Sequence, residues 1–151
     1  MKNELQEVIK EDLIKHEGYK QEIYLDTEGL ATFGIGHLVV EQDMEYGWPV
    51  GTPVEKERID SVFEQDFGIA LSDAQALFLN FDSLPDQVQR VLVNMSFNLG
   101  RTRLGRFKKM ILAVNEGKYE KAADEMVDSR WYNQVGNRSI ELENWMRNAK
   151  V

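Results

Sequence analysis

One stretch near the amino end decides the fold of this chain: residues 16–38, which read HEGYKQEIYLDTEGLATFGIGHL. Strand side chains alternate between the two faces of a sheet. Ile23 and Leu25 are therefore expected on one side of a short strand, and Tyr24 and Asp26 on the other. The alternation predicts that Asp26 ends this strand with its carboxylate on the face of Tyr24.

A turn and a second strand are predicted next. Residues 27–29, Thr-Glu-Gly, are typical of a turn between antiparallel strands. The return run over residues 30–37 alternates again, and it places Thr32, Gly34 and Gly36 on one face. Because two of these residues have no side chain, we expect open space above that face, where a ligand can bind.

Cleavage of a glycosidic bond commonly needs two carboxyl groups in unlike surroundings. One must give a proton to the leaving oxygen, and the other must be ionised to orient water or stabilise positive charge on the sugar. Glu17, which follows the apolar Leu13 and Ile14, is the better candidate for the acid, and Asp26 for the ionised group. The alternative is that both are ordinary solvated surface carboxylates.

The order of residues in this stretch resembles the catalytic segment of the T-even phage lysozymes, muramidases of glycoside hydrolase family 24. By this resemblance Glu17, Asp26 and Thr32 occupy the three positions that the family uses for catalysis. The resemblance extends over nearly the whole chain, through Gln65-Asp66, Asn94-Met95 with Phe97 and Gly100, Ser129 to Gln134, and Asn137-Arg138. It implies an α+β, mainly α fold of two lobes, with a small antiparallel sheet in the N-terminal lobe and a helical C-terminal lobe.

The resemblance also implies an activity: hydrolysis of the β-1,4 bond between N-acetylmuramic acid and N-acetylglucosamine in peptidoglycan. Glu17 would protonate the glycosidic oxygen, while Asp26 and Thr32 would hold a water for inversion. Phe97 and Asn98 are expected to line the cleft, and the resemblance implies that Arg138 approaches Glu17. No metal or other cofactor is expected.

Two other functions remain open at this stage. A lytic transglycosylase would use the same acid but close the muramyl residue into an anhydro ring without water, and the presence of Asp26 together with Thr32 argues against it. A wall-binding or virion structural module would keep the fold without activity, and the intact set of three residues argues against that.

The composition restricts the class of protein. A chain of 151 residues can bury a real core and divide into lobes, but it is too short for two independent domains. It has no cysteine, which excludes disulfides and thiol catalysis. The N-terminal lobe is expected at about residues 15–60, and the C-terminal lobe at about 79–151 plus a helix at 3–14.

The charge and the ends of the sequence give expectations about partners. With 18 basic and 26 acidic residues the net charge is -8, which disfavours nucleic acid binding. No apolar run approaches membrane-spanning length, and residues 1–4 do not start a secretory signal. We therefore expect a monomer made in the host cytoplasm, which acts on the cell wall in the periplasm and depends on a holin to reach it.

One segment is basic in spite of the acidic total. Its cations lie within nine positions: Arg101, Arg103, Arg106, Lys108 and Lys109. They can form a binding surface for an anionic wall polymer. Alternatively, cations that follow Gly100 stabilise the end of a helix, because its dipole favours positive charge there.

Helical periodicity predicts most of the remaining elements. Amphipathic patterns favour helices over residues 3–14, 107–114 and 119–127, and the more uniformly apolar run over 88–99 predicts a central, surrounded helix. A connecting helix is predicted at about 53–78, and residues 39–51 are expected to form a loop.

The ends of several helices can also be predicted. Thr52 is expected to cap the connecting helix, because Pro53 and Glu55 follow it as in a capping box. Residues 129–133 are expected to interrupt the helices, and Asn137 to cap the last one.

Two ionisable groups fall on apolar faces. Asp66 lies on the apolar stripe of the connecting helix, and His37 follows Ala31, Phe33 and Ile35 on the second strand. A buried carboxylate without a cation is costly. We therefore expect Asp66 and His37 to form a structural pair, which the family resemblance also implies.

Overall fold

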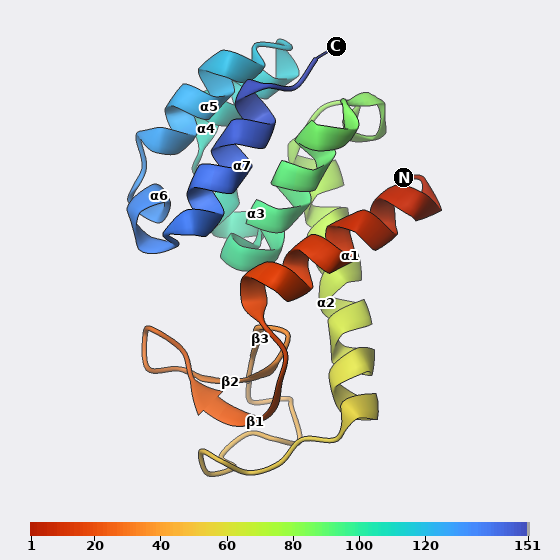
Figure 1. Ribbon diagram of the computed structural model, residues 1–151, viewed down its shortest axis with the longest axis vertical. Coiled ribbons are helices and arrows are strands. Elements are labelled where there is room, and N and C mark those ends of the chain that lie inside the picture. Colours follow the sequence, from red (N-terminus) through yellow and green to blue (C-terminus); the bar gives the residue numbers. More distant parts are fainter. Residues whose placement is uncertain (151) are drawn as a thin grey trace. The chain divides into compact units, whose positions relative to one another are not determined.

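The computed structural model describes residues 1–150 (Figure 1). They form two compact units, one made of Met1–Ile9 and the chain from Ile69 onward, the other of Lys10–Gly68. Most residues are helical, and the only sheet formed by the described residues has three antiparallel strands. The predicted mainly helical α+β class is confirmed.

The unit of residues 10–68 contains the sheet. Helix α1, Asn3–Glu17, leads into it and ends later than the predicted 3–14. Strands β1, β2 and β3 follow in sheet order, at Lys20–Leu25, Ala31–Gly34 and His37–Leu38. In the β1/β2 ladder Tyr24 lies opposite Thr32.

The predicted return strand over residues 30–37 is wrong in its second half. Gly34 and Gly36 have positive φ angles of 65° and 63°, and the chain turns between them. This conformation suits glycine because it has no Cβ. His37 therefore starts β3 and pairs across the sheet with Phe33 instead of following it along one strand.

Residues 39–55 form a loop whose last part lies along β1. The Ile23 N–H donates to the Thr52 carbonyl at 2.9 Å, and the Val54 N–H donates to the Gln21 carbonyl at 2.8 Å. The predicted helix cap at Thr52 is therefore wrong, because long-range pairing with β1 keeps residues 52–54 extended. Helix α2 begins later, and spans Lys56–Leu77.

The other unit is helical from Phe81 to Arg147. Its elements are the 3₁₀ helix η1 (Phe81–Ser83) and the helices α3 (Asp86–Leu104), α4 (Lys108–Asn115), α5 (Tyr119–Val127), α6 (Arg130–Gln134) and α7 (Asn137–Arg147). The interior of α3 is buried on several sides, as its composition predicts, with Val88, Val91, Leu92, Val93 and Met95 fully enclosed. Gly100 interrupts its helical geometry with a φ of 79°. Among residues 1–150, no helix is both long and apolar enough to cross a bilayer.

Two predictions near the carboxyl end are wrong. Residues 130–134 form the short helix α6 rather than an interruption, because the Ser129 hydroxyl accepts the Tyr132 N–H at 3.2 Å and caps it. Trp131 in this helix is buried. Asn137 is the first residue of α7 and not its cap, since Gly136 occupies the cap position with a φ of 61°.

Candidate active site

Glu17 stands at the carboxyl end of α1, where the helix stops. Gly18 follows with a φ of 82°, and its N–H donates to the Ile14 carbonyl at 2.9 Å. The Glu17 carboxyl group packs against Gly36: a Cβ added there would lie 2.7 Å from Oε1 and 2.8 Å from Cδ. The absent side chain of Gly36 therefore leaves the space that the Glu17 carboxyl group occupies.

Asp26 builds the turn between β1 and β2 with one of its two oxygens. Its Oδ1 accepts the N–H groups of Glu28 at 2.8 Å and Leu30 at 2.9 Å. Gly29, with a φ of 79°, closes the same turn by donating to the Asp26 carbonyl at 2.9 Å. No group of residues 1–150 donates to the other oxygen, Oδ2. The turn thus fixes the carboxylate and leaves one oxygen for a ligand.

Thr32 is buried on β2, with 4% of its surface exposed. Its hydroxyl donates to the Leu30 carbonyl at 2.9 Å. Because this bond uses the only hydroxyl hydrogen, Oγ1 meets a ligand as an acceptor.

Tyr24 is linked to each of the three predicted residues. It lies directly opposite Thr32 in the sheet, so both side chains share a face. Burial raises the pKa of its phenol, and the negative charges of Glu17 and Asp26 raise it further. The ammonium of Lys20 lies 4.6 Å from the centre of that ring.

Tyr24 and Lys20 were not among the predicted site residues. Strand alternation already places Tyr24 on the face of Asp26, which was a usable signal. The position of Lys20 depends on the bulge between Lys20 and Tyr24, and the sequence gives no indication of it.

His37 lies between two carboxylates. Its Nδ1 is 2.7 Å from Asp66 Oδ2, the pair expected from the sequence, and its Nε2 is 2.8 Å from Asp43 Oδ2, a partner that the sequence analysis did not identify. Burial lowers the pKa of His37, but the hydrogen bonds and charges of Asp66 and Asp43 outweigh it, so the net shift is upward. Both ring nitrogens are thereby occupied, and no group of three or more possible metal ligands occurs among residues 1–150.

The same cluster extends to a buried ion pair. Arg58 on α2 donates from Nε and Nη2 to the two oxygens of Glu45, at 2.8 and 2.9 Å. Only 1% of the Glu45 side chain is exposed. Arg58 also lies 3.6 Å from Asp43. Residues of the 39–55 loop are therefore tied to both β3 and α2.

The predicted residues of the helical unit have their own partners. Asn98 accepts the indole N–H of Trp131 at 2.7 Å, and Phe97 is half-buried. Arg138 is buried, and its Nε donates to Asn94 Oδ1 at 2.9 Å. Its Nη2 also donates to the Asn94 carbonyl, at 3.4 Å. The approach of Arg138 to Glu17 stays a prediction.

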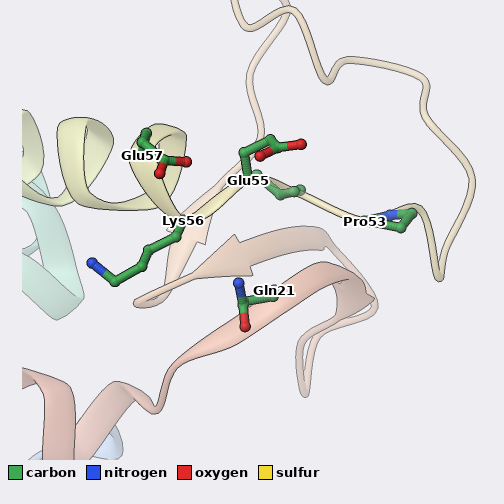
Figure 2. A pocket seen from close by; sticks show the side chains of 6 residues that line it. Gln21, Pro53, Glu55, Lys56 and Glu57 are labelled. Atoms are coloured by element: carbon green, nitrogen blue, oxygen red, sulfur yellow. The ribbon is translucent and has the colours of Figure 1, made fainter.

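An open cavity of about 460 Å³ lies elsewhere in the sheet-containing unit. Figure 2 shows Gln21 on β1 facing the start of α2, where Lys56 and Glu57 lie. The remaining lining comes from residues 53–55. None of the predicted catalytic residues borders it. Lys56 is already paired with Asp60 at 2.8 Å, and we assign no function to this cavity.

Comparison with known proteins covers almost the whole chain. The family model described as phage lysozyme matches residues 14–149. The probable T4-type lysozyme 2 of Dictyostelium discoideum is 32% identical over 148 residues, covering 85% of this chain and 87% of that protein.

Two phage proteins match over part of their own length. The pre-baseplate central spike protein Gp5 of Enterobacteria phage T4 is 27% identical, over 87% of this chain and 26% of that protein. The peptidoglycan hydrolase gp36 of Enterobacteria phage SP6 is 26% identical, over 79% of this chain and 13% of that protein.

Proposed function

Because this chain belongs to the phage lysozyme family, we propose that it is an endolysin muramidase. It hydrolyses the β-1,4 bond between N-acetylmuramic acid and N-acetylglucosamine in peptidoglycan. The observation that carries the proposal is that Glu17, Asp26 and Thr32 lie in one compact unit, where Thr32 pairs with Tyr24 across the sheet and the charges of Glu17 and Asp26 raise the pKa of the Tyr24 phenol. The name of gp36, a peptidoglycan hydrolase, supports the choice of substrate.

Glu17 is the general acid. It gives its proton to the glycosidic oxygen as the bond to the sugar breaks, and positive charge develops on the ring. Gly36 fixes one side of this carboxyl group by its close approach. A fixed position matters because proton transfer requires the acid within hydrogen-bond reach of the oxygen.

Asp26 and Thr32 hold the attacking water. Asp26 Oδ2 and Thr32 Oγ1 are both acceptors here, since the Thr32 hydrogen goes to Leu30. A water bound between them donates both of its hydrogens, so its lone pairs are left to face the sugar. Asp26 takes a proton as the water adds, and attack from the face opposite Glu17 gives inversion. This geometry requires the two carboxyl groups to be about 6.5–9.5 Å apart.

Three residues of the helical unit complete the proposed site. Phe97 and Asn98 line the sugar-binding cleft, and Arg138 stabilises the charge that Glu17 gains when it loses its proton. The Asn94 contact keeps the guanidinium of Arg138 in a fixed orientation.

We also propose the cellular role that was expected from the sequence. The protein is made in the host cytoplasm, reaches the wall in the periplasm through a holin, acts as a monomer and lyses the host. A second candidate, a virion-associated role, has support from the similarity to the spike protein Gp5.

The test is mass spectrometry of fragments released from purified peptidoglycan by the unmutated protein, by Glu17→Gln and by Glu11→Gln. Glu11 is an exposed glutamate of the same helix and is the matched control. We expect reducing muramic ends from the unmutated protein and from Glu11→Gln, and a rate about 10²–10⁴-fold lower from Glu17→Gln.

Other products would refute the proposed muramidase activity and identify a different function. Anhydro ends would identify a lytic transglycosylase, and binding without fragments would identify an inactive wall-binding or virion module. NMR of the first product settles the stereochemistry, because a β-configured reducing end would indicate retention.

A further inference from the structure

The basic segment from Arg101 to Lys109 is unusual in this acidic protein. Its cations, Arg101, Arg103, Arg106, Lys108 and Lys109, are all exposed. The rest of the chain has twice as many acidic as basic side chains. Positive charge is therefore concentrated on one corner of the helical unit.

These cations are not neutralised by the protein itself. None of the five lies within ion-pair distance of a carboxylate of residues 1–150. Cations elsewhere in the chain form ion pairs: Arg58 pairs with Glu45, and Arg147 pairs with both Asp124 and Glu143. The segment thus keeps its charge available in a chain that has carboxylates in excess.

Helix stability explains only part of this arrangement. Arg101 and Arg103 follow the break at Gly100, just past the end of the long continuous part of α3, where the helix dipole favours a cation. Lys108 and Lys109 begin α4, whose first turn has no acidic residue. The dipole disfavours cations at that end. The placement of these two lysines therefore opposes helix stability and requires another explanation.

We propose that the basic segment 101–109 binds the carboxylates of the peptide stems carried by the muramic acid residues of the wall. The inference rests on the proposed function, since it names the part of the same polymer that this surface contacts. Charge complementarity supports it: a protein of net charge -8 is repelled by an anionic wall, and a local cluster of unpaired cations offsets that repulsion.

The experiment measures cosedimentation with purified peptidoglycan sacculi at about 50 mM NaCl, in the Glu17→Gln background so that the polymer stays intact. The test variant is Arg103→Gln/Arg106→Gln/Lys108→Gln. The matched control is Lys2→Gln/Lys121→Gln/Lys150→Gln, which changes the net charge equally at exposed positions outside the segment. We expect the test variant to raise the apparent Kd about tenfold, and the control less than twofold.

A second substrate identifies the ligand. Sacculi whose carboxyl groups have been amidated with a carbodiimide should bind the test variant and the control equally. If the difference between the variants persists on amidated sacculi, the carboxylates are not the ligand. If both variants bind untreated sacculi equally, or if the difference appears only with vesicles of anionic phospholipid, the proposal is overturned.

The outcomes also separate this proposal from the proposed function. Suppose that sacculus binding depends on the segment but the unmutated protein releases no fragments. This result would support the proposed binding surface and refute the proposed hydrolase activity. If circular dichroism shows that the triple variant is unfolded, Arg101→Gln/Lys109→Gln is the test variant and Lys121→Gln/Lys150→Gln its control, each with two charges removed.

Discussion

At the scale of single residues, the site depends on glycine as much as on its acids. Gly36 lies where any Cβ would meet the Glu17 carboxyl group, and its φ of 63° already disfavours other residues. The two effects can be separated, because Gly47 has a φ of 82° and nothing within 4 Å of its Cβ position.

We therefore expect Gly47→Ala to lower the free energy of unfolding by about 1 kcal/mol through backbone strain alone, and Gly36→Ala to lower it by at least as much. Only Gly36→Ala should displace the acid, with a loss of kcat/KM on peptidoglycan of about 100-fold. Urea unfolding and turbidity assays measure the two quantities. Equal activity of the two variants would show that Gly36 does not position Glu17.

His37 gives a prediction about pH. Its pKa is raised above the ordinary value of 6.5 by Asp66 and Asp43. A raised pKa in the folded state means that the stabilisation is fully present below about pH 6.5 and is lost as the pH rises through the folded value.

Substitution His37→Asn should therefore lower the free energy of unfolding by about 2 kcal/mol near pH 5.5, the range for hydrogen bonds between charged groups. The loss should shrink toward pH 9. Urea unfolding of both proteins at several pH values provides the measurement. A loss of the same size at every pH would mean that the histidine is held by packing, not by its charge.

Alternation of residues along a strand predicts that Tyr24 and Asp26 share a face, and it is a local property. The second carboxylate partner of His37 lies only six positions further along the chain, but it belongs to a segment without a regular pattern. Asp43 reaches it from an irregular loop, and nothing in the spacing of residues 37–43 predicts that contact.

At the scale of elements, residues 39–50 are held by an ion pair rather than by apolar burial. Several apolar residues of this segment are exposed, including Met44, Tyr46 and Val50. Its buried anchor is Glu45, held by both donors of Arg58.

Arg58→Leu leaves the Glu45 carboxylate buried without its cation, and should lower the free energy of unfolding by about 3 kcal/mol. The double variant Arg58→Leu/Glu45→Leu removes the unpaired charge and should recover most of the loss. Thermal unfolding of the three proteins is the test. A double variant less stable than Arg58→Leu would show that the ion pair itself stabilises the loop.

Helix α2 contains a glycine that its structure does not require. Gly68 is helical, and a Cβ there would have no neighbour within 4 Å. Gly34, by contrast, would place a Cβ 2.8 Å from Ile59 Cγ2, at a φ of 65°.

The same substitution should thus have opposite effects at the two sites. Gly68→Ala is expected to raise the free energy of unfolding by about 0.5–1 kcal/mol, because alanine loses less conformational entropy in a helix. Gly34→Ala should lower it by more than about 1 kcal/mol. Chemical denaturation provides both values. A destabilised Gly68→Ala would point to a structural role for this glycine.

The elements that the sequence predicted well are those whose pattern is local. Helices α4 and α5 lie close to the predicted 107–114 and 119–127, because a regular apolar stripe determines them. The start of α2 was wrong because residues 52–54 pair with a strand some thirty positions earlier, and a capping pattern contains no information about that partner.

At the scale of the whole molecule, two electrostatic effects oppose each other. The net charge of -8 repels an anionic wall, and the basic segment 101–109 attracts it. Both weaken with salt, since the screening length falls from about 10 Å at 0.1 M to about 3 Å at 1 M.

The ratio of lytic rates between the unmutated protein and Arg103→Gln/Arg106→Gln/Lys108→Gln should therefore be greatest at low salt and approach one near 0.5 M NaCl. The variant Lys2→Gln/Lys121→Gln/Lys150→Gln, which changes the net charge equally, should show a much smaller ratio at low salt. Turbidity assays over a salt series give these ratios. A ratio that is independent of salt would indicate a conformational effect of the substitutions.

The tryptophans give each compact unit its own optical signal. Of three in the chain, Trp48 belongs to the sheet-containing unit and is 37% exposed, while the buried Trp131 belongs to the helical unit. The third, Trp145, also lies in the helical unit, 4.1 Å from the Arg90 guanidinium. Solvent contact should shift the fluorescence emission of Trp48 to longer wavelength and expose it to iodide quenching. With phenylalanine at the other two positions, each remaining indole becomes an intrinsic fluorophore that reports the unfolding of one unit alone.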